Sequence, residues 1–209
     1  AWSATHELML TISPHLRWQG DGAQWMAFLE AGIAAAESQG DMDALAKLHH
    51  QLGWFCRVFS RLEQAEAHAK RAYQLAVQQN DTATRIDALY ELMATAGQRA
   101  DFALVQSYVD ELFALTDAED PQRALPYSLL GHVAARQDDH ESSMHWFSEA
   151  MRLFTASGQP RLASQAEQQL AWVNIYRGRN EQALVHFQHA LETMELHTSL
   201  LDAADVRTD

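Results

Sequence analysis

Aromatic and basic side chains recur in this chain at spacings that place them on one side of a helix. His50, Trp54 and Arg57 stand four and three residues apart, and Tyr176 follows Trp172 by four. Residues three or four apart are neighbours on a helix surface. Tryptophan, tyrosine and arginine dominate binding hot spots, and an arginine can hold a carboxylate through two hydrogen bonds. The pattern therefore indicates a surface that binds a protein or a peptide.

The eleven histidines and the single cysteine do not form a metal-binding pattern. His49 and His50 are adjacent and point in different directions on a helix, whereas His186 and His189 are three apart and share a face. No HExxH motif, thiolate or carboxylate pair completes either set. Cys56 lies among apolar residues, which favours a buried, inert thiol. We expect no metal site and no cofactor.

Motifs that indicate catalysis or nucleotide binding are missing from the sequence. It contains neither of the glycine-rich phosphate-binding patterns, GxxxxGK(S/T) and GxGxxG, and no GxSxG nucleophile motif. No cysteine and histidine stand at a spacing that supports a catalytic pair. We therefore predict that the chain is not an enzyme and has no catalytic residue.

The charge of the chain narrows its partners. Asp and Glu number 28 against 15 Lys and Arg, a formal net charge of -13. Such a chain repels phosphate, so we expect neither a nucleic acid nor an anionic membrane as partner. No apolar run reaches the roughly 18 residues of a membrane span, and a single cysteine allows no internal disulfide. These features fit a cytoplasmic protein with a basic or neutral partner.

Stepping along the chain, loop signals recur about every 40 residues. Outer turns are predicted at 40–41, 80–81, 120–121 and 159–160, and tighter inner turns at 60–62, 100–102, 138–140 and 178–180. Asp41, Asp81 and Asp120 are good candidates for helix N-caps. Glycine and proline are scarce, and Ala, Leu, Gln and Glu exceed Val and Ile, which favours helices throughout.

The spacing predicts a single all-α domain, residues 1–209, made of about five helix pairs. Small residues such as Gly53, Gly131 and Ala171 recur in register and let the helices of a pair approach closely. Two antiparallel helices cannot bury their apolar stripes alone, so successive pairs must stack into one core. The predicted units are 5–39, 42–79, 82–117, 121–156 and 160–197, followed by a tail at 199–209.

The clearest unit resembles a tetratricopeptide repeat. It is residues 169–190, QLAWVNIYRGRNEQALVHFQHA, whose matching positions are Leu170, Ala171, Gly178, Ala183, Phe187 and Ala190. The resemblance implies a right-handed α–α superhelix in which the first helix of each pair lines the concave surface. The period exceeds the usual 34 residues. In this respect the chain is similar to helical sensor regions of large bacterial signalling ATPases and of their transcription-activator relatives.

The resemblance and the register together predict which side chains line the concave face. They are His50, Trp54, Arg57, Tyr90, Gln98, Ser128, His132, Arg136, Gln168, Trp172 and Tyr176. Arg57 and Arg136 would be positive sites able to hold a ligand carboxylate. The alternative is that Trp54 and Trp172 pack against neighbouring pairs and contact no ligand. The asparagines and lysines of the family's carboxylate clamp are missing, so its specificity for chaperone tails is not expected here.

Three functions fit these features. The first is a non-catalytic scaffold that binds a protein or peptide on its concave face. The second is a ligand-sensing segment of a larger bacterial signalling ATPase or transcription regulator. The third is self-association into a homo-oligomer through the ends of the repeat array, because Leu196, Leu200 and Leu201 follow the last pair without a clear polar cap.

Overall fold

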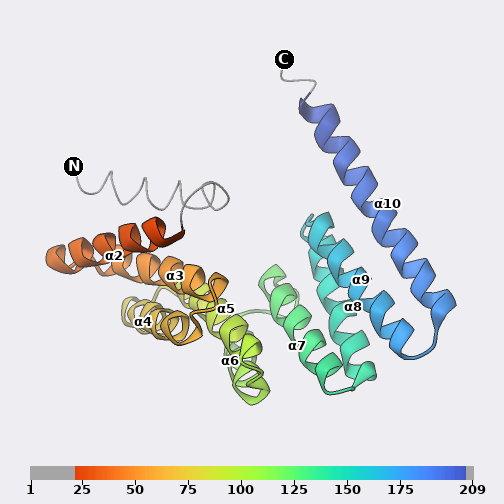
Figure 1. Cartoon of the computed structure of the whole chain (residues 1–209), viewed down its shortest axis with the longest axis horizontal. Coiled ribbons are helices and arrows are strands. Elements are labelled where there is room, and N and C mark those ends of the chain that lie inside the picture. The colour runs from red at the N-terminus through yellow and green to blue at the C-terminus, as the bar shows by residue number, and fades with distance from the viewer. Residues whose placement is uncertain (1–21, 206–209) are drawn as a thin grey trace. The chain divides into compact units, whose positions relative to one another are not determined.

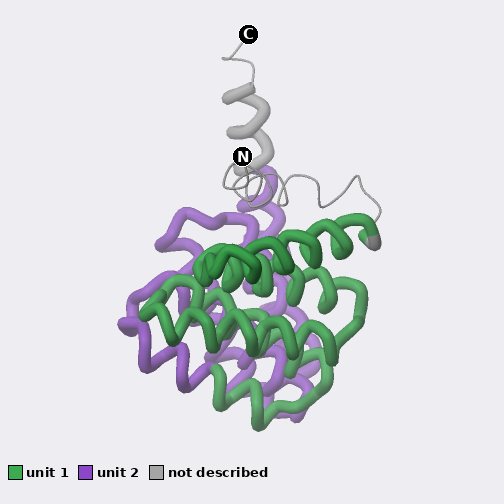
Figure 2. The backbone as a smooth tube through the Cα atoms, turned by 90° about the vertical axis from the view of Figure 1, so that its left-hand side faces the viewer, with its two compact units in different colours: residues 1–108 green, residues 109–209 purple. Residues whose placement is uncertain are grey.

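The computed structural model describes the backbone of residues 22–205, and within it the side chains of residues 24–196. Nine α-helices lie in this range, and it holds no strand. The chain divides into two compact units, residues 1–108 and 109–209, which Figure 2 shows in green and purple. The predicted all-α, tetratricopeptide-like solenoid is therefore confirmed.

Each unit is a series of helices joined by short turns (Figure 1). Unit 1 holds α2 (Gly22–Gln39), α3 (Met42–Val58), α4 (Leu62–Gln79), α5 (Thr82–Gln98) and the first half of α6 (Phe102–Leu115). Unit 2 holds the rest of α6, a 3-10 turn η2 (Pro121–Arg123), α7 (Ala124–Arg136), α8 (His140–Ala156), α9 (Pro160–Tyr176) and α10 (Asn180–Asp205).

The helices alternate between two roles. We call α3, α5, α7 and α9 first helices, and α2, α4, α6, α8 and α10 second helices. In unit 1, α3 packs on α2, α4 and α5, and α4 packs on α5. In unit 2, α8 packs on α7 and α9, and α9 packs on α10. Helices α4 and α8 therefore each contact the first helix before them and the first helix after them.

Three helix pairs lie within the predicted units 42–79, 82–117 and 121–156, and the division of the chain into these units stays a prediction. Of the predicted pair at 5–39, only α2 is described, and residues 1–21 and 206–209 lie outside the described residues. Helix α10 runs to Asp205 instead of ending near 197, so the predicted tail is helical as far as it is described. That residues 1–209 form one domain stays a prediction.

The helices begin where aspartates can cap them. Asp41, Asp81 and Asp139 each accept a hydrogen bond from a backbone N–H three residues on, at 3.0, 3.2 and 3.1 Å, and Asp120 accepts one from the N–H of Gln122 at 2.9 Å. These bonds satisfy amides that a helix start leaves unpaired. Hydrogen bonds at the cap lower the pKa of both Asp81 and Asp139. The predicted caps are confirmed.

Two residues after the end of each first helix, the backbone adopts left-handed geometry. The four residues stand at matching places in the repeat and have φ of 59°, 58°, 58° and 72°: Ser60, Ala100, Asp138 and Gly178. Only glycine adopts this conformation without steric cost. The first three positions therefore carry strain that the repeat imposes on the chain.

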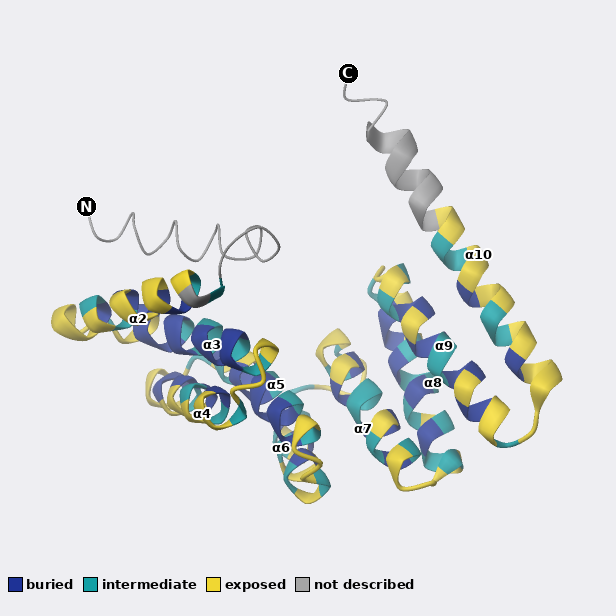
Figure 3. Ribbon diagram, viewed as in Figure 1, coloured by how far each residue is buried: buried dark blue, intermediate teal, exposed yellow. Residues whose placement is uncertain are grey.

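Small residues bring the two helices of a pair into close contact. A Cβ atom on Gly53 would lie 3.3 Å from the backbone oxygen of Ala65, and one on Gly131 would lie 2.8 Å from the ring of Phe147. Buried positions form stripes along the helices, dark blue in Figure 3. Cys56 lies in such a stripe, and burial raises the pKa of its thiol. The buried thiol predicted from the sequence is confirmed.

Two histidines pair inside unit 1. The Nδ1 atoms of His49 on α3 and His68 on α4 lie 2.9 Å apart, and the rings stack with centroids at 5.2 Å. Burial, with repulsion from His68 and Arg71, lowers the pKa of His49 to about 4. Burial also lowers the pKa of His68, against an opposing effect of Glu30. A proton on each ring would place two donors face to face, so acid disrupts this contact.

We expect Ala100→Gly to raise the free energy of unfolding by roughly 0.5–1 kcal/mol, because glycine relieves the left-handed strain. Gly178→Ala is the matched control, since a Cβ there meets no atom within 4 Å and tests the backbone alone. It should lower the free energy of unfolding by about 1 kcal/mol. Urea denaturation followed by circular dichroism measures both. A destabilising Ala100→Gly would contradict the argument.

The histidine pair predicts a specific pH dependence. His49 has a folded pKa near 4, below the unfolded value of 6.5, so its contribution to stability is complete above pH 6.5 and falls as the pH drops toward 4. The loss should be on the order of 2–3 kcal/mol. Urea denaturation between pH 7.5 and 4 should show a shallower decline for His49→Gln/His68→Gln than for the unmodified chain. Equal slopes would contradict this account.

Candidate functional site

All eleven residues predicted for the concave face lie on first helices. His50, Trp54 and Arg57 are on α3 and Tyr90 and Gln98 on α5, in unit 1. In unit 2, α7 carries Ser128, His132 and Arg136, and α9 carries Gln168, Trp172 and Tyr176. The structure therefore brings together one set within each unit, and each set is considered separately.

In unit 1, Arg57 is bound to a carboxylate of the chain itself. Its Nε donates to Oε2 of Glu91 at 2.8 Å, and a second guanidinium nitrogen donates to Oε1 at 3.4 Å. Both side chains are largely shielded from solvent. Two hydrogen bonds to a buried carboxylate hold the guanidinium in place. Arg57 therefore joins α3 to α5, and a ligand carboxylate would have to compete with Glu91 for it.

The other predicted residues of unit 1 are partly engaged in packing. Trp54 is half-buried, stands edge-on to Phe55 with ring centroids 5.0 Å apart, and packs against the core of α2, α3 and α4. His50 is half-buried, and its Nδ1 is shielded without a hydrogen-bond partner among the described residues. Tyr90 is half-buried and Gln98 is exposed. This face offers limited apolar surface to a ligand.

In unit 2, the first helices leave a hollow of about 400 Å³ between them. We call it the α7–α9 groove. Its walls come from α7 and α9, and Phe154 of α8 contributes from the second-helix layer. The residues that line it are Leu125, Ser128, His132, Phe154, Leu162, Gln165, Ala166, Gln168 and Gln169. Ser128, His132 and Gln168 were predicted from the sequence, and the structure brings these three together.

The polar groups of the groove have no partner within the described chain. None of its five polar side chains makes a hydrogen bond to another described group: Ser128, His132, Gln165, Gln168 and Gln169. Each glutamine offers one carbonyl oxygen and two N–H donors. A peptide backbone offers the complementary donors and acceptors. The groove therefore has the chemistry to bind an extended main chain, with Leu125 and Leu162 as apolar walls.

Aromatic rings continue the same two helix faces toward the ends of α7 and α9. Trp172 is 48% exposed and stands edge-on to Phe187, with ring centroids 5.6 Å apart. His132 makes the equivalent contact with Phe147 at 4.9 Å, one repeat earlier. Tyr176 is 70% exposed, although its ring stacks on His140. The contact with Phe187 of α10 orients the Trp172 ring and still leaves about half of its surface exposed to a ligand.

The electrostatics of the groove differ from those of the whole chain. No carboxylate lines it, although the chain has a net charge of -13. Desolvation, with repulsion from Arg136, lowers the pKa of His132, so its imidazole is neutral at pH 7 and can donate and accept. Arg136 is exposed at the end of α7 and supplies a positive charge nearby. The groove suits a neutral or acidic peptide.

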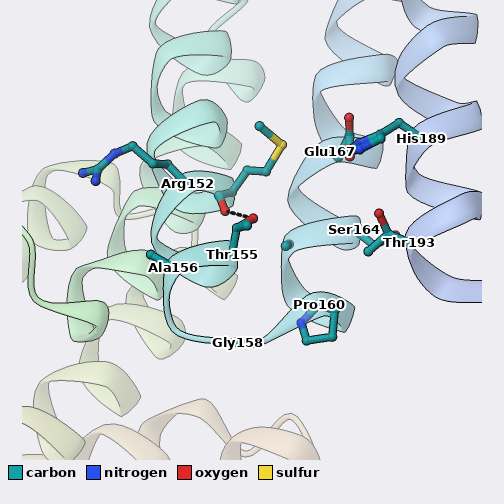
Figure 4. A pocket seen from close by; sticks show the side chains of 11 residues that line it. Arg152, Thr155, Ala156, Gly158, Pro160, Ser164, Glu167, His189 and Thr193 are labelled. Carbon is teal, nitrogen blue, oxygen red and sulfur yellow. Dashed lines mark hydrogen bonds and ion pairs between the residues drawn. The ribbon is translucent and has the colours of Figure 1, made fainter. Parts of the chain in front are cut away.

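A larger hollow, about 810 Å³, lies between α8, α9 and α10 (Figure 4). Most of its polar side chains are already paired. The buried Glu167 contacts Nδ1 of His189 at 2.5 Å and Nδ1 of His186 at 3.4 Å. Ser164 donates to the oxygen of Ala190, and Thr155 donates to the oxygen of Met151 within its own helix. This hollow therefore has fewer unpaired polar groups to offer a ligand than the α7–α9 groove.

The described residues offer neither a metal-binding cluster nor a membrane-spanning helix. Among them, no three His, Cys, Asp or Glu side chains are placed so that they could hold a metal ion. No helix in the described range is long and apolar enough to cross a membrane.

Several site residues were missed by sequence reasoning. Glu91 pairs with Arg57 across two helices, and no local pattern marks such a partner. A signal was available for three missed residues of α9, because residues three apart share a helix face. Gln165 precedes the predicted Gln168 by three, Gln169 precedes the predicted Trp172 by three, and Leu162 precedes Gln165 by three. Phe154 lies on a second helix, so a rule that reads only first helices excludes it.

Comparisons with known proteins agree with this architecture. Residues 122–195 match the family described as tetratricopeptide repeat. No match was found among curated protein sequences. Many solved structures are similar, and three of them represent the match. BtubC from P. vanneervenii has 16% identity and a TM-score of 0.79 and covers 94% of this chain and 82% of its own.

The other two structures are repeat proteins of similar length. Kinesin light chain TPR-like repeats from Podosopora anserina have 11% identity and a TM-score of 0.70 and cover 94% of this chain and 96% of their own. MamA from Desulfovibrio magneticus RS-1 has 17% identity and a TM-score of 0.63 and covers 91% of this chain and 95% of its own. At these identities the likeness concerns the fold.

The fold and the first-helix surfaces define a helical-repeat scaffold of the kind that serves in protein interactions and is typically not catalytic. Residues 122–195 match the tetratricopeptide repeat family, and the chain has the fold of the similar helical-repeat structures. The narrower likeness to bacterial sensor regions stays a prediction.

The Arg57–Glu91 pair predicts strongly coupled mutations. Arg57→Leu alone leaves the buried Glu91 carboxylate unpaired and should cost about 3 kcal/mol of stability. The double variant Arg57→Leu/Glu91→Leu should recover most of that loss, because no charge is then left unpaired in the interior. Urea denaturation of both single variants and the double variant gives the coupling energy. Additive losses would contradict a structural ion pair.

Proposed function

We propose that this protein is a non-catalytic scaffold that binds an extended peptide segment of a partner protein in the α7–α9 groove. One observation carries the proposal. Five polar side chains line a first-helix hollow, and none is hydrogen-bonded to another described group. A partner that hydrogen-bonds to polar groups beside apolar walls stabilises the complex. A peptide backbone can form these hydrogen bonds whatever the peptide sequence.

Selectivity would come from the residues around the groove. Trp172 and Tyr176 are exposed aromatic side chains four residues apart on α9. Large aromatic side chains act as anchors at interfaces, because they bury much area and lose little rotamer entropy. Arg136 supplies the one positive site on α7 beside the groove and can hold a carboxylate of the peptide. An apolar or aromatic peptide with an acidic residue fits best.

The other two functions differ from this one in their ligand or in the surface they use. A sensor segment would hold a small molecule or an upstream protein on the same first helices, and its binding would shift a larger parent between two states. Self-association would use an end of the repeat array. The sequence that surrounds this segment in its gene would distinguish a sensor segment from a free-standing scaffold. Light scattering of the purified chain would measure self-association.

The experiment begins with peptides selected on the immobilised chain from a random displayed library. Trp172→Ala should weaken a selected peptide roughly 30-fold, corresponding to about 2 kcal/mol for an aromatic anchor. Gln165→Ala/Gln168→Ala should weaken it roughly tenfold through two lost hydrogen bonds. Isothermal titration calorimetry gives the affinities, and circular dichroism verifies that each variant is folded.

The matched control is Phe59→Ala, an aromatic side chain of similar exposure at the end of α3. It should leave the affinity unchanged. If the selected peptides bind all of these variants as tightly as the unmodified chain, the α7–α9 groove is not their site and the proposal fails.

A further inference from the structure

Helix α10 repeats the pattern of α8, but no described helix covers it as α9 covers α8. Leu184 and Leu191 occupy the places that Met144 and Met151 occupy in α8, 40 residues earlier. Met144 and Met151 are half-buried and pack against the cluster that joins α8 to α9. Leu184 is 58% and Leu191 59% exposed. Two apolar side chains therefore face solvent where the repeat places a following helix.

Phe187 shows the same loss of cover. It matches Phe147 of α8, which is 1% exposed and lies in one cluster with Leu170 and Val173 of α9. Phe187 has the contact with its own first helix, at Trp172, but it is only half-buried. The missing contact is the one that a following first helix provides.

Where a first helix follows a second helix, an arginine near its start contacts the position that matches Leu191 of α10. The guanidinium of Arg85 lies over the ring of Tyr73, 5.4 Å from its centroid. The guanidinium of Arg123 lies over the ring of Phe113 at 4.4 Å. Tyr73 and Phe113 match Leu191 in the repeat. Both arginines precede or open the first helix that follows.

An arginine just after the end of the following first helix contacts the position that matches Leu184 of α10. Arg99, just after α5, forms an ion pair with Glu66 of α4. Arg177, just after α9, lies 3.2 Å from the Sδ atom of Met144. Glu66 and Met144 match Leu184 in the repeat. The chain thus covers these faces with helices that carry a positive charge at one end or at both.

The uncovered face of α10 is bordered by negative charge. Glu181, Glu192 and Glu195 are exposed on the same helix, and α10 contains no lysine or arginine. A second copy of α10 would place these carboxylates against each other, which costs free energy. A helix with basic residues near its ends would instead find complementary charge at Glu181, near the start of α10, and at Glu192 and Glu195, about three turns further along.

We infer that the α10 face, formed by Leu184, Phe187 and Leu191 with Glu181, Glu192 and Glu195, binds an amphipathic helix of a protein partner that carries arginine or lysine near both ends. The partner helix packs its apolar stripe on α10 as α9 packs on α8. Its basic residues lie at the carboxylates. This surface is separate from the α7–α9 groove and adds a second partner site.

The probe for this site is a labelled peptide of residues 160–179, the segment that covers the matching face of α8 and contains Arg161, Arg177 and Arg179. Fluorescence anisotropy should show saturable binding to the full chain. Leu184→Glu/Leu191→Glu should weaken binding at least tenfold. Glu181→Gln/Glu192→Gln/Glu195→Gln should weaken it several-fold at low salt and by less at high salt, because salt screens exposed charges.

The matched control is Val185→Glu/Leu196→Glu. These two side chains are as exposed as Leu184 and Leu191 but lie on another side of α10, matching His145 and Ala156 of α8, which are exposed. This variant should bind the peptide as well as the unmodified chain. A peptide with its three arginines replaced by glutamine should bind several-fold more weakly. Circular dichroism verifies helix content for every variant.

Three results would overturn the inference. The first is no binding of the peptide, and the second is equal binding by the Leu184→Glu/Leu191→Glu variant and the control. The third is a dimer in light scattering that Leu184→Glu/Leu191→Glu dissociates, because the occupant would then be a second copy of the chain. Weaker binding by Leu184→Glu/Leu191→Glu but not by the control, together with weaker low-salt binding by the glutamine variant and a monomer throughout, supports a basic partner helix.

Discussion

Each second helix of this protein has two apolar sides, and only one of them can be buried by the first helix of its own pair. Phe147 shows the requirement, because it packs at Gly131 on α7 and also lies in one cluster with Leu170 and Val173 on α9. A helix pair alone cannot satisfy both contacts. The repeat exists because the next first helix buries the second apolar side. The groove lies between two such first helices, and the face of α10 is uncovered because no described first helix follows it.

Features set within one repeat could be predicted from the sequence. Aspartate caps such as Asp41 and Asp81 act on amides three residues away, and turns depend on a few neighbouring residues. The repeat register also predicted which residues lie on first helices. The left-handed geometry of Ala100 could not be read from its residue type, because alanine disfavours it, and only the matching Gly178 indicates it.

Contacts between helices were harder to predict, because they depend on how far apart the axes lie. First helices α3 and α5 pack directly, and there Arg57 reaches Glu91. Helices α7 and α9 instead both pack on α8, and the α7–α9 groove opens between them. The sequence predicted the same role for Arg57 and Arg136. The spacing of the helices, which no local pattern encodes, gives Arg57 a carboxylate partner within the chain.

The two proposed surfaces would recognise their partners by different physics. The groove offers amide and hydroxyl groups, which match any extended backbone, so its selectivity would depend on the aromatic residues beside it. The α10 face offers leucines and carboxylates, which match the side chains of a helix and depend on salt. Trp172 and Phe187 are in ring contact. A helix that packs on Phe187 therefore also bears on the orientation of Trp172, so occupancy of one surface would affect the other.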